Sequence, residues 1–93
     1  MDAIIAVSYI CEMKLVRYTK AASKALDRMQ PKRRIAIRFK VDAFARGELV
    51  DVKKLKGSQL LRIRVGDDRV IVDEQEALVI VIEAGPGGGI YKE

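Results

Sequence analysis

The apolar positions of this chain first follow the period of a β-strand, then that of a helix, and finally that of a strand again. Near the start of the periodic region, Leu15 and Arg17 alternate with Val16 and Tyr18, which predicts a short strand. The alternation does not tell which side of this strand is buried. A fold that combines helices and strands is therefore expected.

Two amphipathic helices joined by a tight turn follow this strand. Thr19 provides an N-cap side chain, and apolar residues then recur at helical spacing while the lysines fall on the other side. Pro31 ends the first helix, because proline lacks the N–H and disfavours helical backbone in the residue before it. Gly47 stands where a second helix would end in a left-handed residue. The apolar stripe of that second helix consists of Ile37, Val41 and Phe44.

After a polar linker at residues 48–58, the period changes to two, and residues 61–73 predict a β-hairpin. In its first strand the aliphatic side chains face the core while Arg62 and Arg64 face away. Gly66 supplies turn chemistry, and the returning strand places Arg69 on the face of the other two arginines. The hairpin therefore predicts a cluster of cations on one face of the sheet.

The last part of the chain predicts a central strand, a glycine-rich loop and a short final strand. Residues 77–84 are apolar on both faces, as in a central strand that helices cover on one face and another segment shields on the other. The loop is GPGGG at residues 85–89, and residues 90–92 form the short strand. Together these elements predict an α+β fold, with an N-terminal strand and a helical hairpin packed on a mostly antiparallel sheet.

Composition limits the chain to one folded domain with a basic surface. Ninety-three residues with 49% hydrophobic content support a single core and lie far from the composition of disordered proteins. The net charge of +5 favours a polyanionic partner, either nucleic acid or an acidic protein. A basic surface that only serves solubility is the alternative reading of the same charge.

Cysteine and histidine content restrict the chemistry further. Cys11 is the single cysteine, which excludes an intramolecular disulfide and a cysteine-based metal site, and the chain contains no histidine. A reducing cytoplasm is the expected location.

Residues 1–12 are too few to span a bilayer and lack the cationic start of a secretory signal. We interpret them as an extension before a domain at residues 13–93, with an added edge strand as the alternative.

Three motifs together resemble a known family. They are LKGS at residues 55–58, LRIRVGDDRVI at residues 61–71, and the closing AGPGGGIYKE at residues 84–93. As a set they resemble the RelE/ParE toxin superfamily of type II toxin–antitoxin systems, over about residues 13–93. For the favoured RelE-like branch, the resemblance implies a ribosome-dependent endoribonuclease that cuts mRNA without metal or cofactor. It also implies the ribosome, mRNA and a cognate acidic antitoxin as partners.

The resemblance also assigns candidate site residues. Arg62 and Arg64 match two strand positions that are often lysines in active RelE-like toxins, and Arg69 matches the arginine after the turn. Tyr91 matches a C-terminal tyrosine that stacks on or orients the substrate. From these matches Arg62 and Arg69 are expected to stabilise the scissile phosphate. Contacts with the RNA backbone are expected from Lys53, Lys54 and Lys56.

Each of these assignments has a simpler alternative. Arg62 and Arg64 are also what the solvated face of a half-buried strand contains, and Tyr91 is equally suited to packing on the sheet. Three departures from the family pattern bear on catalysis. Arg64 cannot accept a proton because a guanidinium stays protonated. The loop at residues 85–89 carries no basic residue, and Asp68 stands where an aromatic residue is common.

Two other functions fit the same fold. A ParE-like inhibitor of DNA gyrase would bind its target without catalysis, and a detoxified member would bind an antitoxin as a corepressor. The missing cation in the loop at residues 85–89 favours the gyrase inhibitor, while the arginine cluster favours the enzyme. The chain is an enzyme only under the RelE-like reading.

Overall fold

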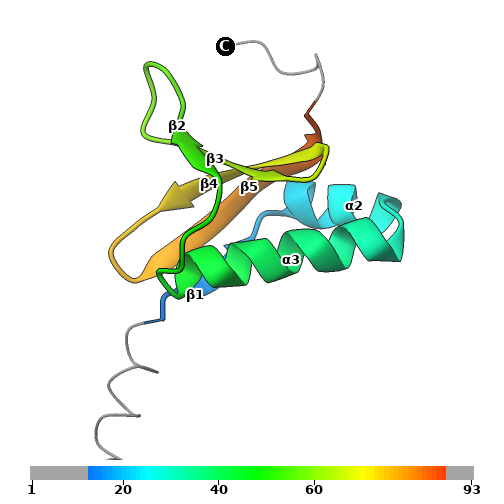
Figure 1. The fold of residues 1–93 in the computed structure, drawn as a ribbon, viewed down its shortest axis with the longest axis horizontal. Coiled ribbons are helices and arrows are strands. Elements are labelled where there is room, and N and C mark those ends of the chain that lie inside the picture. The colour runs from blue at the N-terminus through cyan, green and yellow to red at the C-terminus, as the bar shows by residue number, and fades with distance from the viewer. Residues whose placement is uncertain (1–12, 88–93) are drawn as a thin grey trace, which may run out of the picture.

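The computed structural model describes residues 13–87, which form one five-stranded sheet with two helices on one face (Figure 1). This arrangement confirms the predicted α+β class. Residues 1–12 and the predicted strand at residues 90–92 lie outside the described residues. The elements are β1 (Leu15–Tyr18), α2 (Lys20–Arg28), α3 (Pro31–Ala45), β2 (Val52–Lys54), β3 (Leu61–Val65), β4 (Asp68–Glu74) and β5 (Leu78–Pro86).

The strand order across the sheet is β1-β5-β4-β3-β2. Only β1 and β5 pair in parallel, and the other three pairs are antiparallel, so the sheet is mostly antiparallel as predicted. Strand β5 lies between β1 and β4, so it is the central strand that the sequence predicted. Strand β2 was not predicted, because its three residues are all exposed and show no alternation. It lies within the segment that the sequence indicated as a linker.

Helix α2 begins and helix α3 ends where the sequence indicated. Thr19 Oγ1 accepts a hydrogen bond from the Ala22 N–H at 3.1 Å and so caps α2. The same hydroxyl donates to the Ile82 carbonyl at 3.0 Å, which attaches the start of α2 to β5. Gly47 follows α3 with a φ of 84°, a conformation that favours glycine.

The core lies between the two helices and the facing side of the sheet. Val16 and Tyr18 pack against this core, so the inward side of β1 is the one opposite Leu15 and Arg17. Burial of each large aliphatic side chain contributes roughly 1.5–3 kcal/mol relative to leaving it exposed. The largest fully buried side chains are Leu26, Ile37, Val41, Ile63, Val70, Val72, Val79 and Val81.

The outer face of the sheet, opposite the helices, carries the alternate residues of the same strands. Val70 belongs to the core cluster, so Arg69 and Ile71 on either side of it lie on the outer face. The same alternation places Arg62 and Arg64 there. Within residues 13–87, no helix is both long and apolar enough to cross a membrane.

Candidate functional site

Three arginines meet in one pocket at the end of the sheet formed by the β3–β4 turn. Arg62 and Arg64 come from β3 and Arg69 comes from β4, and all three line a pocket of about 420 Å³. Arg64 lies directly opposite Arg69 in the strand register. The predicted convergence of the three arginines is therefore present in the structure. The pocket is completed by Gly66, Asp67, Asp68 and Gly87.

The tight turn between β3 and β4 sets this register. Two residues, Gly66 and Asp67, separate the strands, and Gly66 has a φ of 60°. A two-residue hairpin with a positive φ at its first position matches the twist of the flanking strands. Because side chains alternate along a strand, this register puts every second residue of the two strands on the same face.

Asp68 faces the helices and is held by Arg33. Its side chain is 7% exposed and accepts hydrogen bonds from Arg33 Nε at 3.1 Å and Arg33 Nη2 at 2.5 Å. The carboxylate of Asp68 raises the pKa of the Arg33 guanidinium further above its ordinary value. Asp68, the acidic residue that departs from the family pattern, thus attaches the β3–β4 turn to the first turn of α3.

The segment after β5 forms one wall of the pocket. Strand β5 continues through Pro86, so the sequence placed the end of this strand too early. The Gly87 N–H then donates a hydrogen bond to the Asp67 carbonyl at 2.7 Å. Gly87 and Asp67 were missed as pocket residues, because the glycine-rich loop carries no side-chain pattern from which a partner can be predicted.

The three lysines predicted to contact RNA lie in two places. Lys53 pairs in register with Arg62, so it extends the cationic outer face onto β2. Lys54 and Lys56 instead line a separate pocket of about 530 Å³ in the loop between β2 and β3. That loop is closed by a hydrogen bond from Leu55 N–H to the Leu60 carbonyl at 2.9 Å. The lysines therefore do not form one cluster.

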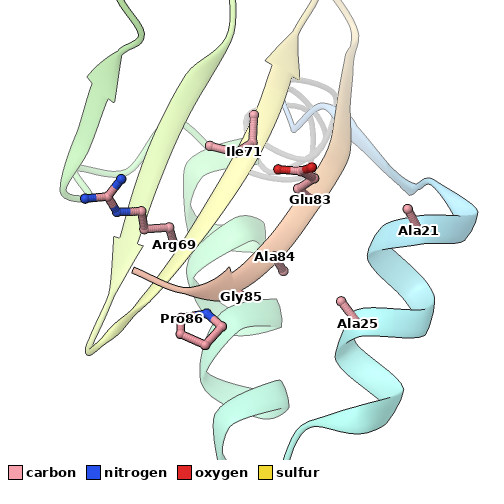
Figure 2. A pocket seen from close by; sticks show the side chains of 8 residues that line it. All are labelled: Ala21, Ala25, Arg69, Ile71, Glu83, Ala84, Gly85 and Pro86. Atoms are coloured by element: carbon pink, nitrogen blue, oxygen red, sulfur yellow. The ribbon is translucent and has the colours of Figure 1, made fainter. Parts of the chain in front are cut away.

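A second cleft lies on the other side of the Arg69 side chain. It has a volume of about 370 Å³ and lies between α2 and the end of β5. Figure 2 shows Arg69 pointing away from Ala21 and Ala25 of α2. Arg69 lines both this cleft and the arginine pocket, so its direction affects both.

Within the described residues, no tyrosine lines the arginine pocket. Tyr18 lies on the helix side of the sheet, with the Arg38 guanidinium carbon 4.9 Å from its ring centroid. Burial raises the pKa of the Tyr18 hydroxyl above its ordinary value. Tyr91, the predicted substrate-orienting residue, lies outside the described residues. Residues 13–87 contain no cluster of three or more side chains able to hold a metal ion.

The arginine pocket is suited to binding an anion. A guanidinium presents planar N–H groups that match the oxygens of a phosphate and stays charged at all physiological pH values. Of the two aspartates in the pocket, Asp68 is already bound by Arg33. The arginine side chains can therefore stabilise negative charge, but they cannot accept a proton.

Known structures share this fold, although no profile of a known family and no curated protein matches the sequence. The archaeal RelE–RelB complex from Pyrococcus horikoshii matches with 26% identity and a TM-score of 0.67, over 83% of this chain and 98% of that chain. The toxin–antitoxin complex RelBE2 from Mycobacterium tuberculosis matches with 19% identity and a TM-score of 0.70, over 80% and 91%. The DinJ–YafQ toxin–antitoxin complex from E. coli matches with 14% identity and a TM-score of 0.69, over 86% and 99%.

Proposed function

Because this chain belongs to the RelE-like toxin superfamily, we propose that it is the toxin of a type II toxin–antitoxin pair and cuts mRNA on the ribosome. The single observation that carries the enzymatic part is the convergence of Arg62, Arg64 and Arg69 on one pocket. Cross-strand pairing of Arg64 with Arg69 concentrates positive charge at this pocket. A phosphodiester group carries the negative charge that such guanidinium groups bind.

The proposed reaction is cleavage of RNA by its own 2′-hydroxyl. The 2′-hydroxyl loses its proton to the solvent as its oxygen bonds to the adjacent phosphorus, the bond from phosphorus to the 5′ oxygen breaks, and this oxygen takes up a proton. The products are a 2′,3′-cyclic phosphate and a 5′-hydroxyl. Negative charge accumulates on the phosphate oxygens during the attack, and preorganised cations stabilise it. The ribosome holds the message so that the attacking and leaving oxygens are in line.

Each arginine has a role in this proposal. Arg62 and Arg69 hold the scissile phosphate, Arg64 adds positive charge beside them, and Lys53 contacts the neighbouring RNA backbone. No proton transfer is assigned to the arginines, because a guanidinium does not give up its proton at physiological pH. Lys54 and Lys56 form a separate contact to the RNA backbone, at the loop between β2 and β3. Tyr91 is assigned to orienting the substrate.

The proposed partner in the resting cell is an acidic antitoxin. Three structures with the same fold are toxin–antitoxin complexes. A partly disordered acidic segment that folds on binding can wrap a basic sheet face and shield its cations. Such a segment would cover the arginine pocket and keep RNA out of it.

Cleavage is tested by expressing the chain without its antitoxin and mapping mRNA ends on translating ribosomes by toe-printing. We expect cuts in the ribosomal A site, and a loss of about 10²-fold to 10³-fold in cleavage for Arg62→Ala or Arg69→Ala. The matched control is Lys40→Ala, which removes an exposed cation from α3 and should leave cleavage within about twofold. Growth arrest with intact mRNA would remove the enzymatic proposal.

A ParE-like gyrase inhibitor is the second candidate, and one observation favours it. The pocket wall formed by the segment after β5 contributes Gly87, which has no side chain to donate a proton. Under this reading the chain would induce a DNA damage response, and its toxicity would depend on gyrase. Under the detoxified reading, expression would be harmless while the chain still raised the operator affinity of its antitoxin.

A further inference from the structure

Gly87 lies so close to the Arg69 side chain that a larger residue would fit only if neighbouring atoms moved. A methyl group on Gly87 would lie 2.8 Å from Arg69 Cγ, 3.0 Å from Arg69 Nε and 3.2 Å from the Asp67 carbonyl oxygen. These distances are shorter than van der Waals contact between such atoms. The hydrogen bond from Gly87 N–H to the Asp67 carbonyl, at 2.7 Å, holds the glycine in this place.

A positive φ does not explain why residue 87 is a glycine. The glycines with positive φ in the described part of the chain are Gly47, Gly57 and Gly66. Gly85 and Gly87 therefore lack the φ that favours glycine. What distinguishes Gly87 from Gly85 is space, since a methyl group on Gly85 would meet nothing within 4 Å.

We propose that Gly87 is a positioning residue, which directs the Arg69 guanidinium by leaving room for the Arg69 side chain. Arg69 Cγ lies close to the backbone, and its position is set by the χ1 angle. A methyl group that displaces Cγ forces a different χ1, and this rotation carries the whole guanidinium with it. Because Arg69 lines both the arginine pocket and the cleft beside α2, its rotation changes the charge of the pocket.

The role in catalysis rests on the proposed function, in which Arg69 holds the scissile phosphate. The steric part does not, and it can be tested on the isolated protein. The comparison is Gly87→Ala against Gly85→Ala, the same substitution two residues apart. Gly85 lies directly opposite Arg69 in the strand register, which makes it a close control for any change in the local backbone.

The first measurement is the nuclear magnetic resonance signal of the Arg69 Nε–H group, assigned by its disappearance in Arg69→Lys. We expect this signal to shift in Gly87→Ala and to stay in place in Gly85→Ala. An unchanged signal in Gly87→Ala, with a shifted amide signal at residue 87, would mean that the backbone yields instead and would overturn the proposal.

The second measurement is a double-mutant cycle on cleavage by translating ribosomes. We expect Gly87→Ala to lower kcat about tenfold to 10²-fold with little change in KM for the ribosome complex. Gly85→Ala should stay within about twofold. In the Arg69→Ala background the clashing Cγ and Nε atoms are absent, so Gly87→Ala should have no further effect. Additive losses would show that Gly87 acts independently of Arg69.

Two outcomes outside this scheme are also decisive. If the wild-type chain cuts no mRNA, the proposed function fails, while the Nε–H signal still decides whether Gly87 positions Arg69. If Gly87→Ala does not fold, the double variant with Arg69→Ala should restore the thermal unfolding transition, because it removes the clash. A double variant that also fails to fold would overturn the proposal.

Discussion

Arg64 and Arg69 face each other across neighbouring strands, which places two like charges side by side. Like charges directly opposite in an antiparallel pair repel, and both side chains lie on the outer face of the sheet. In the proposed function, the same two charges attract the phosphate of the RNA.

Replacing one arginine of this pair should stabilise the protein while weakening its activity. We expect Arg64→Thr to raise the free energy of unfolding by about 0.2–1 kcal/mol in urea at low salt, with a smaller gain at high salt. Arg17→Thr is the matched control, since Arg17 lies on the same face but pairs in register with the apolar Ile80. An equal gain in both variants would show that strand propensity, and not charge repulsion, is responsible.

At the scale of the elements, one charged contact adds to the apolar core in joining the hairpin that carries the arginines to the helical layer. Arg33 in the first turn of α3 binds both carboxylate oxygens of Asp68, the first residue of β4. Arg69 is the next residue along the strand, so this contact also holds the start of the strand that presents it. The core and this charged pair together therefore fix the position of the pocket relative to the helices.

Neutralising Asp68 should loosen this attachment. We expect Asp68→Asn to lower the free energy of unfolding by about 1–3 kcal/mol, because one oxygen acceptor becomes an N–H₂ group facing the Arg33 donors. Asp67→Asn, at the neighbouring exposed carboxylate, should change it by less than about 0.5 kcal/mol. Urea unfolding of both variants gives the comparison. Similar losses would mean that the turn, and not the contact with α3, carries the stability.

At the scale of the whole molecule, the main feature is that the two faces of the sheet differ. The helices cover one face of the sheet (Figure 1). The outer face presents the arginine pocket. With a net charge of +5, the chain attracts acidic partners from a distance. The outer face is the place where that attraction becomes a specific contact in the proposed function.

Binding of the proposed antitoxin should depend on charge at the outer face. We expect the complex with the product of the adjacent reading frame to weaken with rising salt, and Arg64→Glu to weaken it at least about tenfold. The matched control Lys24→Glu reverses an exposed charge on α2 and should change the affinity by less than about threefold. Calorimetric titration measures both. Equal effects would place the antitoxin elsewhere on the molecule.

Most secondary structure of the described residues could be predicted from the sequence, because each signal is local. The cap at Thr19, the break at Pro31, the end at Gly47 and the turn at Gly66 all act within a few residues of themselves. Alternation in β3 and β4 placed the three arginines on one face, because a strand has a period of two. The fold class and the core of the site follow from these local rules.

Contacts between distant segments were decided only by the tertiary structure. Strand β2 has no alternation and exists through its pairing with β3, and the inward side of β1 depends on its packing under the helices. Asp68 becomes a structural residue because Arg33, 35 positions earlier, reaches it. The close contact between Gly87 and the Arg69 side chain exists because the chain after β5 passes next to β4. A hydrophobic pattern describes one segment at a time, whereas these contacts depend on how two segments are placed in space.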